Sequence, residues 1–160
     1  MIRYTLAACD LGRVLLAATE RGVCWLSFND ADAGALAALR AEFPTSDLHR
    51  DDAGLAPSVA ALKNHLADNS QTLDLPLDVH ATAFQQSVWD KLRQIPRGET
   101  RTYQQVAIAI GKPTAARAVA RACATNPVSV VIPCHRVVGT DGELRGYRWG
   151  LWRKKSLLAA

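Results

Sequence analysis

Alternating apolar and polar positions at the start of the chain predict β-strands. Ile2, Tyr4 and Leu6 alternate with polar residues, and two apolar runs, RVLLAA and VCWLSF, follow the turn sequences DLG and ERG. Strands joined by turns this short pair with their neighbours in antiparallel fashion. We therefore expect a small three-stranded antiparallel sheet in the first third of the chain.

The apolar spacing then changes to that of helices. Leu36, Leu39 and Phe43 share one helical face before Pro44, and Pro57 can begin a second helix because its fixed φ suits the first helical turn. The inner side of that second helix would carry Val59, Leu62 and Leu66. Together with the strands, these two helices predict an α+β fold for the first half.

Two capping-box patterns mark helix starts in the second half. In each pattern, Thr82 with Gln85 and Thr102 with Gln105, a hydroxyl and a side-chain amide are spaced so that each bonds the other residue's backbone N–H. A final basic helix is expected where the sequence reads LWRKKSLL. The second half is therefore predicted to be mainly helical.

Two of these helices are predicted to form a helix-turn-helix unit. The second capped helix would end at Gly111, Pro113 would open the next one, and that helix would span 114–124. Its outer face carries Arg117 and Arg121 among alanines, and a face with so little bulk suits close approach to a DNA groove, although arginines on a solvated face are common. Its inner face would carry Ala116, Val119, Ala120 and Cys123.

Charge divides the chain into two halves. Residues 1–78 carry 6 Lys and Arg against 11 Asp and Glu, residues 79–160 carry 13 against 4, and the net charge is +4. The mixed stretch 69–82 between them is predicted to be a linker. We expect an N-terminal structural domain over 1–78 and a second domain over 79–160 whose positive charge indicates a polyanion, with nucleic acid as the working hypothesis.

Composition narrows the class of protein. Hydrophobic residues make up 49% and charged residues 21%, no apolar run approaches the roughly 18 residues of a membrane span, and the first residues lack the features of a signal peptide. The four cysteines, Cys9, Cys24, Cys123 and Cys134, include no Cys-x-x-Cys pair. We therefore expect a cytoplasmic protein with no cofactor, metal or membrane contact.

The sequence VIPCHRVVG at 131–139 sets a thiol beside an imidazole in an apolar run. A structural reading treats Pro133 and Cys134 as a buried turn, because cysteine behaves as a small hydrophobe. A chemical reading treats Cys134 as a nucleophile whose pKa is lowered by His135 and Arg136. The position of the thiol directly after a predicted DNA-binding helix favours the chemical reading.

The second half resembles the O6-alkylguanine-DNA alkyltransferases over residues 80–158. The resemblance rests on PCHRVVG, on the preceding ATNP and TYQQVAIAIGKPTAARAVA, and on GYRWG, which looks most like the C-terminal methyltransferase domain of bacterial Ada proteins. The first half resembles the same proteins more weakly. The resemblance implies a ribonuclease H-like N-terminal domain and a winged-helix-like domain that carries the active site.

The resemblance also implies a repair reaction. The alkyl group, mainly methyl, would pass from O6 of guanine, and from O4 of thymine, to the protein's own cysteine in one irreversible turnover. A base inside a duplex must leave the stack to react. The partner would be double-stranded DNA containing O6-alkylguanine, bound through its minor groove by a monomer.

By resemblance, five residues would form the catalytic site. Cys134 would attack as a thiolate, His135 would hold the thiol proton through a water, and Tyr103 would donate a hydrogen bond toward the base. Asn126 would brace the turn that joins the DNA-binding helix to the site, and Lys154 would support the pocket wall. Arg117 would fill the space left by the flipped base, and the other DNA contacts would be Gln104, Lys112, Thr140 and Arg121.

Three family features are absent from these 160 residues. The glutamate that hydrogen-bonds the histidine in the family would stand one position beyond Ala160. Cys9 and Cys24 lack the spacing of the zinc ligands that some members carry in the N-terminal domain, so no metal is expected. The regulatory cysteine cluster of Ada is also missing, and transcriptional activation by this chain alone is not expected.

Two other functions fit parts of the pattern. A thiol hydrolase would use the Cys–His pair for acyl transfer and would turn over, but it leaves the positive second half unexplained. A plain DNA-binding module would explain the charge but would need no ordered thiol. Alkyl transfer accounts for the thiol, the helix pair and the charge together.

Overall fold

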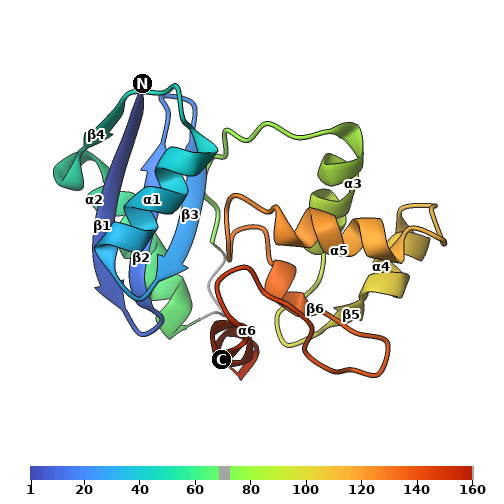
Figure 1. Cartoon of the computed structure of the whole chain (residues 1–160). Coiled ribbons are helices and arrows are strands. Elements are labelled where there is room, and N and C mark those ends of the chain that lie inside the picture. Colours follow the sequence, from blue (N-terminus) through green and yellow to red (C-terminus); the bar gives the residue numbers. More distant parts are fainter. Residues whose placement is uncertain (69–72, 160) are drawn as a thin grey trace. The chain divides into compact units, whose positions relative to one another are not determined.

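The computed structural model describes residues 1–68 and 73–159. The chain divides into two compact units, Met1–Val79 and His80–Ala160, which are blue to green and green to red in Figure 1. None of the helices in the described ranges has both the length and the apolar character that crossing a bilayer requires.

The first unit is built on the predicted three-stranded meander. Its strands are β1 (Ile2–Cys9), β2 (Gly12–Ala18), β3 (Val23–Asn29) and the short β4 (Leu48–Arg50). The first three pair antiparallel, as predicted, with Leu6 opposite Leu15 and Leu16 opposite Leu26. The fourth pairs parallel to β1 and gives the order β3-β2-β1-β4. Its three residues are too few to show a strand period, so the sequence pattern did not predict it.

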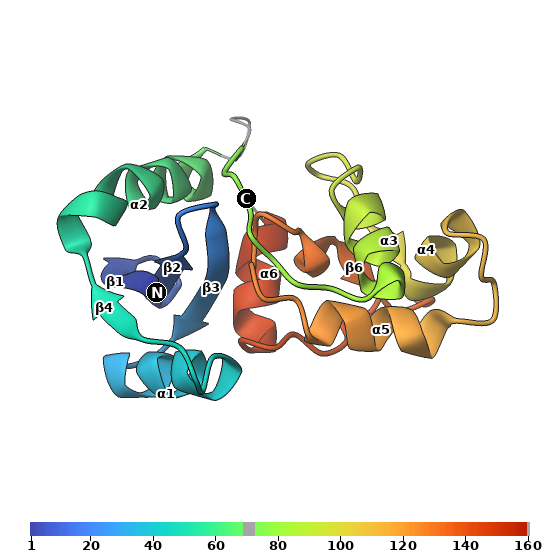
Figure 2. The same cartoon turned by 90° about the horizontal axis from the view of Figure 1, so that it is seen from above.

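Two helices cover this sheet. Figure 2 shows α1 (Asp32–Glu42) and α2 (Asp52–Ala67) on opposite faces of it, and nearly every residue of β3 is buried. The expected start of α2 at Pro57 is wrong. The helix begins at Asp52 because the Asp51 carboxylate accepts a hydrogen bond from the Gly54 N–H at 2.9 Å, so Pro57 lies inside the helix.

The predicted linker is partly incorporated into the first unit. Residues 69–72 lie outside the described residues. Beyond them, the N–H of Val23 donates to the carbonyl of Pro76 at 2.8 Å, and the N–H of Asp78 donates to the carbonyl of Val23 at 2.9 Å. The segment therefore extends the edge of β3, and the first unit continues to Val79.

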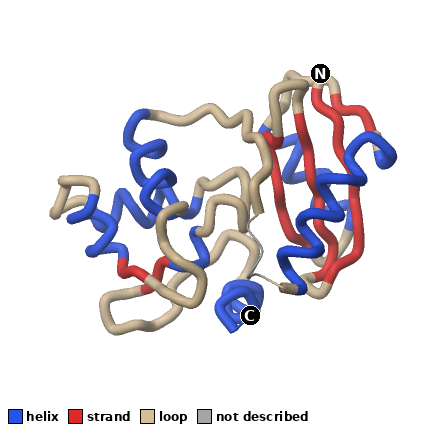
Figure 3. The backbone as a smooth tube through the Cα atoms, turned by 180° about the vertical axis from the view of Figure 1, so that it is seen from behind, coloured by secondary structure: helices blue, strands red, loops and turns tan. Residues whose placement is uncertain are grey.

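The second unit is mainly helical, as expected (Figure 3). Its helices are α3 (Ala83–Leu92), α4 (Tyr103–Ala109), α5 (Ala116–Ala124) and α6 (Leu151–Ala159), with a 3₁₀ turn, η1 (Cys134–Arg136). Two short strands, β5 (Arg101–Thr102) and β6 (Val137–Val138), pair in parallel. Both capping boxes are confirmed, with all four predicted hydrogen bonds between 2.9 and 3.1 Å.

Helices α4 and α5 form the predicted helix-turn-helix pair. Gly111 follows α4 with φ of 77°, the left-handed conformation that glycine adopts without strain. Helix α5 begins at Ala116, two positions later than expected, because a turn closed by the Ala115 N–H and the Lys112 carbonyl precedes it. The buried face also differs from the prediction. Ala122 lies in the core, and its carbonyl accepts a hydrogen bond from Trp89 Nε1 of α3 at 3.0 Å.

Candidate active site

The apolar segment before the thiol is a buried turn, whereas the run of β-branched residues favours a strand. The N–H of Val131 bonds the carbonyl of Ser129 at 2.9 Å, and the N–H of Ile132 bonds the carbonyl of Val128 at 3.1 Å. Between them, Val130 has a φ of 72°, which is rare for a β-branched residue. This compact turn leads directly into η1 and places Cys134 at its first residue.

Asn126 holds the turn and the thiol together. Its side chain is buried; Nδ2 donates to the carbonyl of Ile132 at 2.7 Å and to Cys134 Sγ at 3.2 Å. Its Oδ1 accepts from the N–H of Val128 at 2.9 Å. One amide thus satisfies both ends of the turn and fixes the sulfur, which is the bracing position expected for Asn126.

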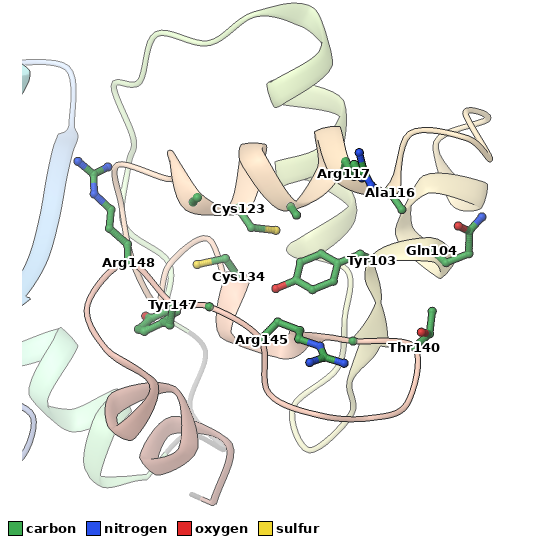
Figure 4. A pocket seen from close by; sticks show the side chains of 14 residues that line it. Tyr103, Gln104, Ala116, Arg117, Cys123, Cys134, Thr140, Arg145, Tyr147 and Arg148 are labelled. Atoms are coloured by element: carbon green, nitrogen blue, oxygen red, sulfur yellow. The ribbon is translucent and has the colours of Figure 1, made fainter.

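The thiol lies in a pocket of about 1020 Å³. The pocket is lined by α4, α5, η1 and the loop from Gly139 to Arg148 (Figure 4). Among the residues that the structure describes, the lining includes three arginines, Arg117, Arg145 and Arg148, and no carboxylate. Across the described part of the chain, no group of three or more His, Cys, Asp or Glu residues lies close enough together to hold a metal ion.

Opposing effects act on the pKa of Cys134. Burial raises it, while the hydrogen bond from Asn126 and the positive charges of Lys154 and Arg148 lower it. The expectation that Arg136 lowers this pKa is not supported, because Arg136 is not among the groups that lower it; its Nη1 donates to the carbonyl of Ile95 at 2.9 Å. His135 is buried on the same turn as the thiol.

Lys154 is a fully buried cation beside two thiols. Its Nζ lies 3.4 and 3.5 Å from the carbonyl oxygens of Arg145 and Gly146, and 5.8 Å from the centre of the Tyr103 ring. Burial lowers the pKa of Lys154, and Cys134 and Cys123 oppose that effect. A cation in this position stabilises a thiolate more than water-exposed lysine would, because the site has a low dielectric.

Tyr103 points its hydroxyl toward the thiols (Figure 4). It begins α4, where the Thr102 cap fixes the first turn. Burial raises its pKa to about 12. The phenol is therefore protonated at neutral pH and is available as a hydrogen-bond donor.

The sequence-predicted DNA residues divide into two groups. Arg117, Gln104 and Thr140 line the pocket together with Cys134. Gln104 is also fixed by its own hydrogen bond, from Nε2 to the carbonyl of Pro113 at 2.6 Å. The other two residues, Lys112 and Arg121, are exposed and lie outside the lining.

Several lining residues were not assigned to the site from the sequence, among them Cys123, Arg145 and Tyr147. Cys123 was assigned to the core, yet its thiol faces the pocket with that of Cys134 (Figure 4). Arg145 and Tyr147 come from the loop before α6. The Asp-Gly pair at 141–142 is typical of a turn, but the sequence pattern does not indicate how far the following residues fold back toward the site.

Comparisons with known proteins agree with this architecture. The model of the 6-O-methylguanine DNA methyltransferase DNA binding domain matches residues 83–160, and that of the ribonuclease-like domain of the same enzyme matches residues 2–79. The crystal structure of Mycobacterium tuberculosis OGT in complex with DNA superposes with a TM-score of 0.82 at 34% identity, covering 98% of this chain and 91% of that one.

Two curated relatives differ in length. The bifunctional transcriptional activator/DNA repair enzyme Ada of Escherichia coli is 51% identical over 157 residues, which are 98% of this chain but 44% of Ada. This chain thus spans less than half of that relative. The methylated-DNA–protein-cysteine methyltransferase of Methanosarcina barkeri is 39% identical over 97% of this chain and 94% of its own length. Two domain matches and a full-length relative lead to one conclusion: the chain belongs to the O6-methylguanine DNA methyltransferase family.

Proposed function

We propose that this chain repairs DNA by transferring an alkyl group, mainly methyl, from O6 of guanine, and from O4 of thymine, to Cys134 in a single turnover. The observation that carries the proposal is the buried Cys134 thiol, held by Asn126 Nδ2 at 3.2 Å in a pocket that the helix-turn-helix pair helps to line. A thiol hydrolase would not need that helix pair beside its nucleophile.

The reaction balances as a simple displacement. The Cys134 thiol loses its proton, through a water, to His135. The sulfur then forms a bond to the alkyl carbon while the bond between that carbon and O6 breaks, and the electron pair stays with the guanine, which takes up a proton. The resulting thioether has no good leaving group, so no step with these residues regenerates the thiol.

Two further residues assist the departure of the base. Tyr103, whose pKa of about 12 keeps it protonated, donates a hydrogen bond to the leaving guanine as negative charge develops on the ring. Lys154 stabilises the thiolate and, through the carbonyls of Arg145 and Gly146, supports the pocket wall.

The partner is double-stranded DNA with an O6-alkylguanine, bound through the minor groove by a monomer. Helix α5 enters the groove, and Arg117, at the pocket mouth, occupies the place of the flipped base. The small pocket-facing residues Ala116, Ala120 and Ala124 support this, because they let the DNA backbone approach closely. Gln104, Thr140, Lys112 and Arg121 provide the remaining contacts. Four free cysteines suit a reducing compartment, so we place the activity in the cytoplasm.

Intact-mass spectrometry tests the proposal. After mixing with excess duplex DNA that contains O6-methylguanine, each protein molecule should gain one methyl group, located on Cys134 by peptide mapping. Cys134→Ser should gain none and still bind the duplex, while Cys9→Ser, a thiol of the first unit, should react like the unsubstituted chain. Repair of several substrate molecules per protein molecule would contradict the proposal, as would methylation at another residue.

A further inference from the structure

The loop between β6 and α6 holds one arginine in a fixed place. One oxygen of the Asp141 carboxylate accepts a hydrogen bond from the Glu143 N–H at 3.0 Å, and the other accepts from Arg145 Nη2 at 2.8 Å. The N–H of Gly139 closes the loop on the carbonyl of Glu143 at 2.9 Å. A single carboxylate thus shapes the loop and orients the guanidinium.

Gly139 provides the space for this arginine. A Cβ at position 139 would lie 3.0 Å from Asp141 Oδ1, and 2.7 Å from Arg145 Nε and 3.1 Å from Arg145 Cγ. The two arginine atoms are inner atoms of the side chain, so Arg145 would have to leave its position if residue 139 carried a side chain. The glycine and the carboxylate therefore act on the same side chain from two directions.

Stability does not explain this arrangement. The side chains of Arg145 and Asp141 are 57% and 52% exposed. An ion pair this exposed contributes about 0–1 kcal/mol to folding. The arginine is more readily explained by what it faces.

Arg145 lines the same pocket as Cys134, together with Tyr103 and Thr140. Figure 4 shows its side chain below the Tyr103 ring, with the guanidinium pointing away from the two thiols. Its charge also lowers the pKa of Tyr103, against the larger effect of burial. The backbone carbonyl of Arg145 is fixed from within by Lys154 Nζ at 3.4 Å. The guanidinium is thus held on an exposed side of the pocket that contains Cys134.

We propose that Arg145 binds a phosphate of the flipped nucleotide and so positions its base against Cys134. The Asp141 carboxylate binds the guanidinium at Nη2, along one edge of its plane. The remaining N–H groups are left to donate to phosphate oxygens. This assignment rests on the proposed function, and it makes Arg145 a DNA contact rather than a participant in bond breaking.

The test compares two substrates. Free O6-methylguanine base carries no phosphate, whereas the base in a duplex does. Arg145→Ala should lower the rate of methylation by the duplex about tenfold or more, the value of a charge-assisted hydrogen bond, and change the rate with the free base less than twofold. It should also reduce the slope of the salt dependence of duplex binding by about 1. Arg93→Ala, which removes the same charge from an exposed site outside the pocket, is the matched control and should change neither rate by more than twofold.

Two further variants test the orientation. Asp141→Asn makes the protein more positive, which by charge alone would strengthen DNA binding. If the carboxylate orients Arg145, the duplex rate should fall instead. Gly139→Ala should also slow the duplex reaction, but should have no further effect in the Arg145→Ala background.

Equal losses on duplex and free base would overturn the proposal and assign Arg145 to the base or to Tyr103. An unchanged duplex rate in Arg145→Ala would also overturn it. In both cases the unsubstituted chain still methylates Cys134, so the proposed function survives. If the unsubstituted chain transfers no methyl group to Cys134, the proposed function itself fails.

Discussion

The two units of the chain differ in what they bury. Among the described residues, the buried polar side chains of the first unit are Thr5 and Ser27. Those of the second unit are Asn126, Ser129, His135, Arg153 and Lys154. The first unit keeps its charges on the surface, where Arg3 pairs with Asp51 and Arg13 with Asp32. The second unit encloses cations and amides around a thiol.

This difference separates stability from chemistry. An apolar core between two helices and a sheet stabilises the first unit mainly through the burial of apolar side chains. A buried ammonium costs free energy unless a partner compensates it, and Lys154 has two backbone carbonyls at 3.4 and 3.5 Å. The second unit therefore gives up some stability to place a cation near Cys134. Substitutions in the core of the first unit should therefore lower stability and spare the rate of methyl transfer, whereas replacing Lys154 in the second unit should lower the rate and spare stability.

The largest effect is expected in the core of the first unit. Leu16 is fully buried on the central strand β2. Leu16→Ala should lower the free energy of unfolding of that unit by about 2–5 kcal/mol, because it leaves a cavity. The rate of methyl transfer by folded molecules should change less than twofold. Thermal denaturation and single-turnover kinetics, measured well below the transition, check both values. A parallel loss of rate would remove the distinction between the units.

The second-largest effect is expected at Lys154, where a substitution should lower the rate but not the stability. Lys154→Met replaces the buried ammonium side chain with an uncharged one of similar length, so the melting temperature should stay the same or rise. The rate at pH 7 should fall, because the thiol pKa rises when the Lys154 charge no longer lowers it and the thiolate fraction then decreases.

The pH dependence of the rate shows in which direction Lys154 shifts the pKa of Cys134. Burial already raises the pKa of Cys134, so the rate should increase with pH in the unsubstituted chain. Without Lys154 that pKa rises further, and the profile should move to higher pH. Rates from about pH 6 to pH 10 bracket the ordinary cysteine value. Lys155→Met, at an exposed neighbour on α6, is the control. A profile that Lys154→Met leaves in place would exclude its electrostatic role.

The sequence predicted the parts of this molecule that local chemistry decides. The capping boxes at Thr82 and Thr102, the glycine at the end of α4 and the meander of β1 to β3 follow from patterns within a few residues. The start of α2 was missed because an aspartate cap outweighs the proline signal, and β4 was missed because its pairing with β1 is not local.

The site was predictable only in part for the same reason. The PCHR motif and the helix before it predict from the sequence that Cys134 is the nucleophile, and the structure places its thiol in the pocket. The pairing of Arg145 with Asp141 across a loop, and the approach of Lys154 to the thiol from α6, depend on tertiary contacts. The turn at Val130 could be predicted even less well from the sequence, because VSVVI has the composition of a strand. The Asn126 amide makes three hydrogen bonds that outweigh this preference.

That turn also concentrates backbone strain in the second unit. Among the described residues other than glycine, Val130 alone has a positive φ, at 72°. Its side chain is buried, so replacing it removes apolar contacts as well as strain. A comparison of alanine with glycine separates the two effects, because these residues differ little in apolar area.

At an ordinary position outside a turn, glycine is less stable than alanine by roughly 0.5–1 kcal/mol because its unfolded chain has more freedom. At a left-handed position the order reverses, since alanine is strained there. Val130→Gly should therefore be more stable than Val130→Ala by about 1 kcal/mol, measured by denaturant unfolding of the second unit. Val131, buried in the same turn without a positive φ, should show the ordinary order, with Val131→Ala the more stable. If the alanine variant is more stable than the glycine variant at both positions, residue 130 is not strained. The contrast between the units would then rest on the buried polar groups alone.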